Sequence, residues 1–153
     1  VLAFSLFTAL ALPAFAQARD VTFTTELQSY NGDGAYLALY LTDAAGEYQG
    51  TLWVSGKKSK YYKHLGGWAR GSGLDPAEYD GLTGASVTSG RTLKVTLNLD
   101  DSLIDNGYEV RVDSAVEDMR DIRADVIAPL TTEGSGKPVS GRGYVRALTY
   151  ELQ

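Results

Sequence analysis

The sequence predicts an all-β protein, an immunoglobulin-like β-sandwich of about six to eight strands with little helix. Two observations support this prediction. Short runs that alternate between apolar and polar residues recur along the chain, which is the pattern of strands buried on one face. Clusters of Gly, Asn, Asp and Ser separate these runs, as the turns between short strands require.

Three strands are expected before residue 56. Residues 21–28 alternate between apolar and polar side chains and predict a half-buried strand. Two apolar faces over 35–42 predict a strand that is buried on both sides. The turn cluster 31–34 predicts a tight hairpin between them, and it lacks the ligand spacing of a calcium loop. A third strand over 50–55 contains Trp53, whose indole we expect in the core.

Residues 56–68 predict a short helix, because Tyr61, Leu65 and Trp68 are spaced at i, i+4 and i+7. Four lysines crowd the stretch Lys57–Lys63. Such a cluster is usually a solvated face. The functional alternative is a positive patch that meets a ligand phosphate or an acidic partner.

The second half of the chain continues the strand pattern. Residues 93–99 give the clearest alternation in the sequence. Asp-Asn-Gly at 105–107 predicts a hairpin turn, and 131–143 predicts a mobile loop rich in Gly, Ser and Thr. The remaining strands are expected at 108–113, 126–127 and 144–152.

Composition excludes several classes of function. The chain has 153 residues and a formal net charge of -5, which gives no electrostatic basis for binding nucleic acid. It has no cysteine, which excludes disulfides, iron–sulfur clusters and thiolate zinc sites. His64 is the one histidine, so the chain alone cannot form a multi-histidine metal site. An electron carrier of this composition needs an organic cofactor.

Residues 1–18 predict a secretory signal peptide that is truncated at its start. An uncharged apolar run ends at Pro13, and Ala-x-Ala cleavage frames follow it. The run is too short for a membrane anchor, so the protein is expected not to span a membrane after signal cleavage. We expect the mature protein to begin near Arg19, with 19–153 forming a single sandwich domain. The predicted location is extracytoplasmic, and periplasmic in a cell with two membranes.

The stretch 80–89 is a run of small and hydroxyl residues with an acid at its head. Gly84 and Ala85 leave the backbone bare, so a second enzyme could grip the segment and present the Ser86 hydroxyl as a nucleophile. We expect an exposed loop here. The structural alternative is a flexible turn that is rich in Gly, Ser and Thr for conformational reasons alone.

Asp80, Thr83, Gly84, Ala85 and Ser86 resemble the flavinylation motif of exported FMN-binding domain proteins, although the acceptor is Ser where Thr is commoner. The resemblance implies that an FMN transferase cleaves FAD and leaves FMN on Ser86 as a phosphoester. It also implies that Asp80 and Thr83 are recognition positions, and that Gly84 and Ala85 give the transferase access. None of these residues would catalyse a reaction in the finished protein.

The order of features along the whole chain resembles the DUF2271 family of predicted periplasmic proteins. These features are an early Tyr-rich strand, a Leu-Trp-Val strand, a Lys-Tyr…Leu…Trp segment, the Thr-Gly-Ala element and an Asn-Gly-Tyr hairpin. The resemblance implies an exported β-sandwich, often found alongside PepSY-type membrane proteins and the FMN transferase.

These resemblances imply an exported flavoprotein electron carrier that passes electrons between a PepSY-type membrane redox partner and an extracytoplasmic acceptor. Trp68, Tyr61 and Tyr62 are candidates to stack on the flavin, and Trp68 is equally a candidate for the core. His64 is either a proton donor near the flavin or a simply exposed side chain. The alternative function is a non-redox periplasmic binding or structural module without a cofactor. A Ser86 hydrolase is disfavoured because no nucleophile elbow accompanies the serine.

Overall fold

The computed structural model describes residues 17–153, so most of the predicted signal peptide lies outside the described residues. The strands are β1 (Ala18–Leu27), β2 (Tyr36–Thr42), β3 (Tyr48–Ser55), β4 (Thr83–Gly84), β5 (Thr92–Asp100), β6 (Glu109–Ala115), β7 (Asp121–Pro129), β8 (Val139–Ser140) and β9 (Val145–Leu152). The helical elements are η1 (Ser59–His64), α1 (Gly66–Ser72), η2 (Pro76–Glu78) and η3 (Asp101–Leu103).

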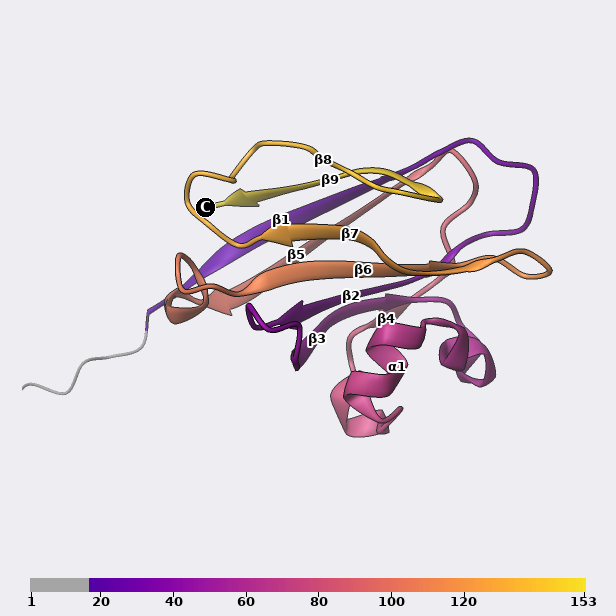
Figure 1. The fold of residues 1–153 in the computed structure, drawn as a ribbon, viewed down its shortest axis with the longest axis horizontal. Helices are drawn as coiled ribbons and strands as arrows, with labels where there is room; N and C mark the ends of the chain where they lie inside the picture. The colour runs from indigo at the N-terminus through magenta and orange to yellow at the C-terminus, as the bar shows by residue number, and fades with distance from the viewer. Residues whose placement is uncertain (1–16) are drawn as a thin grey trace, which may run out of the picture.

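Two sheets pack face to face, which confirms the predicted all-β sandwich (Figure 1). One sheet has the strand order β5-β1-β9-β8 and the other has the order β4-β3-β2-β6-β7. The first and last long strands are neighbours, because β1 pairs antiparallel with β9 on one side and with β5 on the other. The ends of the described chain therefore lie in the same sheet.

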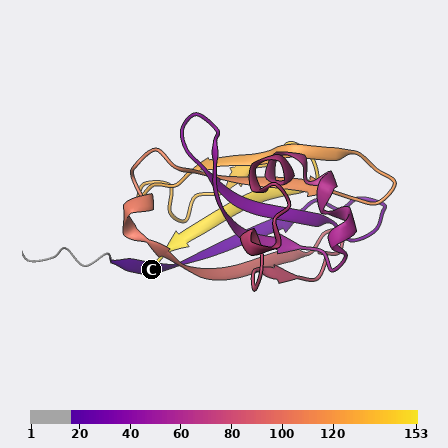
Figure 2. The same cartoon turned by 90° about the horizontal axis from the view of Figure 1, so that it is seen from below.

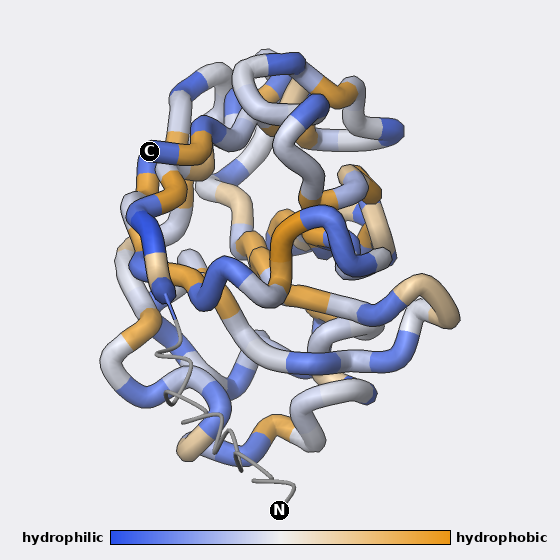
Figure 3. Tube along the Cα trace, turned by 90° about the vertical axis from the view of Figure 1, so that its left-hand side faces the viewer, coloured by the Kyte–Doolittle hydropathy of each residue, from blue (hydrophilic) through white to orange (hydrophobic). Residues whose placement is uncertain are grey.

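Strand β2 is the centre of the five-stranded sheet and is buried on both faces, as its sequence predicts. Leu37, Leu39 and Leu41 point into the main core between the two sheets. Ala38 and Tyr40 point the other way, into a second core beneath η1 and α1. Residues 59–72, which contain these two helices, are called the helical segment below. Figure 3 shows the result along the trace, with apolar stretches separated by hydrophilic loops.

The helical segment covers the outer face of the five-stranded sheet (Figures 1 and 2). Its buried apolar residues are Tyr62, Leu65 and Trp68, at intervals of three, whereas Tyr61 is only half-buried. The sequence places Tyr61 on the same helix face as Leu65, four residues later. This placement is wrong, because η1 is a 3₁₀ helix with three residues per turn, and Tyr62 is buried in place of Tyr61. The indole Nε1 of Trp68 donates a hydrogen bond of 2.9 Å to Thr51 Oγ1, which fixes the segment on β3.

Both tight hairpins predicted from turn signals are wrong. The connection after β1, which contains residues 31–34, crosses to the other sheet, and so does the connection between β5 and β6 at residues 105–107. Asp105 and Gly107 do adopt the positive φ angles that such turns use, 61° and 85°. Turn chemistry marks a change of direction, but it does not specify that the flanking strands pair. Within residues 17–153, the consecutive strands that pair antiparallel are β2–β3, β6–β7 and β8–β9.

Two further expectations need adjustment. The short strand expected at residues 126–127 is part of the nine-residue strand β7. The segment expected as a loop over 131–143 contains β8, which pairs with β9 through Val139 and Ser140. In both places the neighbouring strand supplies pairing that the local sequence does not reveal.

Candidate functional site

Ser86 lies on an exposed segment between two backbone anchors. On one side, Leu82 and Gly84 accept hydrogen bonds of 2.9 and 2.8 Å from amides at the edge of β3. On the other side, Val87 and Ala35 exchange backbone hydrogen bonds of 2.7 and 3.0 Å. The segment is therefore the two-residue edge strand β4 followed by the exposed two-residue span of Ala85 and Ser86.

The other motif residues do not line a common pocket. Asp80, Thr83 and Ala85 are exposed on the surface, where another protein can reach them. Gly84 has a structural role as well, because a Cβ placed on it would lie 2.7 Å from Cζ2 of the half-buried Trp53. Only Ser86, among the motif residues, faces the adjoining cavity.

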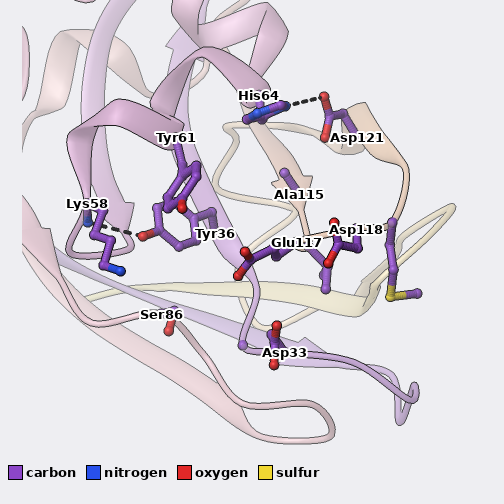
Figure 4. A pocket seen from close by; sticks show the side chains of 13 residues that line it. Asp33, Tyr36, Lys58, Tyr61, His64, Ser86, Ala115, Glu117, Asp118 and Asp121 are labelled. Atoms are coloured by element: carbon purple, nitrogen blue, oxygen red, sulfur yellow. Dashed lines mark hydrogen bonds and ion pairs between the residues drawn. The ribbon is translucent and has the colours of Figure 1, made fainter.

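That cavity has a volume of about 550 Å³ and is shown in Figure 4. This is the size range of small-molecule sites in proteins. Ser86 enters from one side, with its hydroxyl above Gly34: a Cβ placed on Gly34 would lie 2.8 Å from Ser86 Oγ. Other residues of the lining are Asp33, Tyr36, Lys58, Tyr61, His64, Glu117, Asp118, Met119 and Asp121.

One wall of the cavity is aromatic and basic. The rings of Tyr36 and Tyr61 meet edge to face, with centroids 5.8 Å apart and planes at 90°. The amide of Lys58 donates a 3.1 Å hydrogen bond to the Tyr36 hydroxyl, and the Lys60 ammonium lies 5.0 Å from the centroid of the Tyr61 ring. An aromatic ligand could stack on one of these perpendicular rings and meet the edge of the other, with the Lys58 charge nearby. Four carboxylates also line the cavity, those of Asp33, Glu117, Asp118 and Asp121, and they disfavour an anionic group beside them.

Trp68 and Tyr62 take no part in this wall. Trp68 is fully buried, so its ring is a core residue and presents no face to a ligand. The Tyr62 hydroxyl donates a 2.8 Å hydrogen bond to the Gly56 carbonyl, and burial raises its pKa. Of the three aromatic residues that the sequence offers for stacking, only Tyr61 lies in the cavity with Ser86.

His64 and Asp121 form the far end of the cavity. Nδ1 of His64 lies 2.9 Å from Oδ2 of Asp121, and both side chains are nearly half exposed. The hydrogen bonds of residues 17–153 include none between Ser86 and His64, so no nucleophile–base pair is assembled.

Two fully buried carboxylates, those of Asp113 and Asp125, connect segments that surround the site. Asp113 accepts hydrogen bonds from the Tyr40 hydroxyl at 2.9 Å, the Trp68 amide at 2.7 Å and the Ala124 amide at 2.8 Å. Burial, and then Asp113, raises the pKa of Tyr40. Asp125 accepts hydrogen bonds from Ser114 and from the amides of Arg142, Gly143 and Val145. The helical segment, the β6–β7 hairpin and the loop before β9 are joined through these two residues.

Sequence reasoning missed most of the cavity lining. The sequence predicts Tyr36 only as part of a buried strand, and residues 117–121 lie outside every strand that it predicts. Both belong to segments that approach Ser86 through sheet pairing. No local motif marks them, so only the fold reveals that they share a cavity.

The fold and the site define a class: a two-sheet β-sandwich with a helical cover, and with an exposed serine beside an aromatic-walled cavity. The profile of a family described as "Predicted periplasmic protein (DUF2271)" matches residues 18–147, and the chain belongs to this family. This confirms the family resemblance and the extracytoplasmic location. No curated protein and no solved structure matches the chain. No helix among residues 17–153 is long and apolar enough to cross a membrane.

Proposed function

We propose that this protein is an exported flavoprotein electron carrier that holds FMN through a phosphoester on Ser86. The observation that supports the proposal is the position of the Ser86 hydroxyl. It is exposed, it lies within the flavinylation-like motif, and it borders the cavity that Tyr36 and Tyr61 line. The aromatic residues of the lining therefore suit the ring of a tethered cofactor.

The attachment reaction is a group transfer catalysed by a separate FMN transferase. The Ser86 oxygen attacks the phosphorus of the FMN half of FAD, and the bond to the AMP half breaks. AMP leaves, and the hydroxyl proton passes to a base of the transferase. The bare backbone at Ala85 and the exposed side chains of Asp80 and Thr83 are available for recognition.

In the finished protein, the chain's own residues bind and orient the cofactor. A flavin, when bound, supplies transfer of one or two electrons. Tyr61 and Tyr36 offer the aromatic wall, and Lys58 offers a positive charge near the attachment point. His64, with Asp121, can hold a proton at the far end of the cavity. The expected partners are a PepSY-type membrane redox protein and an extracytoplasmic acceptor.

The proposal is tested by expressing the exported protein together with an active FMN transferase. Intact mass should show one added FMN moiety on the mature chain, and the band should fluoresce after denaturing electrophoresis. Ser86→Ala should lose both signals while its circular dichroism is unchanged, because an exposed hydroxyl contributes little to stability. Thr88→Ala removes an exposed hydroxyl from the same segment and should keep the flavin.

Two results would contradict the proposal. An unmodified wild-type chain beside a transferase that labels a known acceptor would favour a non-redox binding or structural module. Flavin that persists in Ser86→Ala and disappears in Thr88→Ala would move the attachment point to Thr88.

A further inference from the structure

A second recess of about 530 Å³ adjoins the Ser86 cavity, and His64 and Asp121 line both. Four cationic side chains converge on this recess from three parts of the chain. Lys63 comes from η1, Arg120 and Arg123 come from the β6–β7 turn and β7, and Arg142 comes from the loop between β8 and β9. We propose that this recess, named the basic recess below, is a binding site for a multivalent oxyanion of the phosphate or sulfate class.

The charge of the basic recess is opposite to that of the whole chain, which has a formal net charge of -5. The carboxylate in its lining is Asp121, which is already hydrogen bonded to His64. The ion pairs formed by residues 17–153 include none with Lys63, Arg120, Arg123 or Arg142. Because like charges repel when they are brought together, a bound anion would stabilise this arrangement.

Two of the arginines are held in place before any ligand arrives. Arg142 donates from Nε to the Ala124 carbonyl at 3.1 Å, and its guanidinium also reaches the Arg123 carbonyl. Ala124 has a φ of 45°, an unfavourable angle for a residue with a side chain. Its amide donates to the buried Asp113, and the Arg142 amide donates to the buried Asp125 at 2.7 Å.

This strained bulge in β7 is therefore maintained by two buried carboxylates. Backbone strain of this kind persists where the surrounding structure enforces it, and it is common at ligand sites. Arg123 packs closely against Gly66, since a Cβ on that glycine would lie 2.5 Å from Arg123 Nε. The arrangement fixes donors in advance, which lowers the entropic cost of binding an anion.

The chemistry of the donors selects the ligand class. The guanidinium groups of Arg120 and Arg123 present paired N–H donors that match two oxygens of a phosphate or sulfate. Arg142 gives Nε and Nη2 to backbone carbonyls and contributes its charge, and Lys63 adds a mobile charge. A monovalent halide would leave these paired donors unused. The inference goes beyond the proposed flavin and stands without it, because Ser86 does not line the basic recess.

The test uses the mature chain carrying Ser86→Ala, so that no covalent flavin is present. Inorganic phosphate is titrated at constant ionic strength, and amide chemical shifts are followed by NMR. The recess variant is Lys63→Gln with Arg120→Gln, two exposed side chains whose loss should leave the fold intact. The control is Arg91→Gln with Lys94→Gln, which removes the same two charge types from a segment outside the recess.

Saturable phosphate binding should be weakened about tenfold in the recess variant, a loss of about 1.4 kcal/mol, because two of the four cations that line the recess are removed. The control should bind within about twofold of the parent, since overall charge alone acts weakly at fixed ionic strength. No saturable shift in the parent would overturn the inference. Equal weakening in the control would also overturn it, because phosphate would then be responding to net charge and not to this site.

Discussion

The indole of Trp53 packs directly on the backbone of Gly84. A Cβ placed on Gly84 would lie 2.7 Å from Cζ2 of Trp53, closer than carbon atoms approach without displacement. Gly84 is also an anchor of the exposed segment, because its carbonyl accepts the amide hydrogen of Gly56 at 2.8 Å. The path of Ala85 and Ser86 past the cavity therefore depends on a glycine at this position.

Gly84→Ala is expected to lower the free energy of unfolding by about 1–3 kcal/mol, the usual cost of forcing an extra methyl group into a packed contact. Trp53 or the β4 backbone must move to accommodate the methyl group. Urea denaturation followed by tryptophan fluorescence measures the change.

Gly50→Ala in β3 is the matched control, because no heavy atom lies within 4 Å of a Cβ built there. Its free energy of unfolding should be unchanged or slightly higher, since alanine restricts the unfolded chain. A similar loss in both variants would show that the Trp53 contact does not limit residue 84.

Asp113→Asn is expected to lower the free energy of unfolding by about 3 kcal/mol. The carboxylate accepts from three donors, those of Tyr40, Trp68 and Ala124, and an amide would turn an N–H group toward at least one of them. Chemical denaturation measures the loss. Asp20→Asn makes the same change at an exposed position of β1 and should cost less than about 0.5 kcal/mol.

The strands could be predicted from the sequence because each buries one or both faces, and burial leaves a local pattern. The 93–99 alternation became β5 and the two apolar faces of 35–42 became the central strand β2. Which turns join paired strands could not be predicted, since residues 31–34 and 105–107 have the composition of hairpin turns but connect the two sheets.

Only the part of the candidate site that is contiguous in the sequence could be predicted. The motif residues around Ser86 are contiguous, and the sequence alone singles them out. Tyr36 and Asp121 join them through the pairing of β2 with β6 and of β6 with β7, which brings distant segments together. Whether Trp68 or Tyr61 lines the cavity depends on η1 being a 3₁₀ helix. The sequence does not distinguish the three-residue spacing of a 3₁₀ helix from the spacing of an α-helix.

Alkaline pH should destabilise the fold through the half-buried phenol of Tyr48. Burial raises the pKa of Tyr48 from 10.0 to about 12, and its hydrogen bond to Glu78 adds to the shift while that to Thr51 opposes it. The folded-state pKa therefore lies above the unfolded value. The contribution of Tyr48 is complete below pH 10 and is lost as the pH rises from 10 to 12.

The measurement is the urea midpoint of the wild type and of Tyr48→Phe between pH 8 and pH 11.5. The wild type should lose more stability over this interval than the variant, which has one titrating phenol fewer. Identical pH dependence of the two proteins would show that Tyr48 ionises with an ordinary pKa in the folded state.

Trp68→Ala and Tyr61→Ala should separate the core from the cavity. Trp68 is fully buried beneath the helical segment, so its truncation should cost about 3–5 kcal/mol. Tyr61 is half-buried with its ring against Tyr36, and its truncation should cost about 1 kcal/mol or less. Equal losses in chemical denaturation would contradict the assignment of Tyr61 to the cavity wall.

Flavin fluorescence gives the functional half of the same comparison, in protein loaded by the FMN transferase. An aromatic ring in contact with a flavin quenches its emission, so Tyr61→Ala should raise the emission per bound flavin. Trp68→Phe keeps the core filled and should leave the emission unchanged, because the indole is shielded from the cavity. The reverse pattern, with Trp68→Phe raising the emission and Tyr61→Ala having no effect, would place the flavin ring against the helical core and away from the Ser86 cavity. Because both variants retain Ser86, their flavin content by intact mass should match that of the wild type, which separates a change in contact from a loss of attachment.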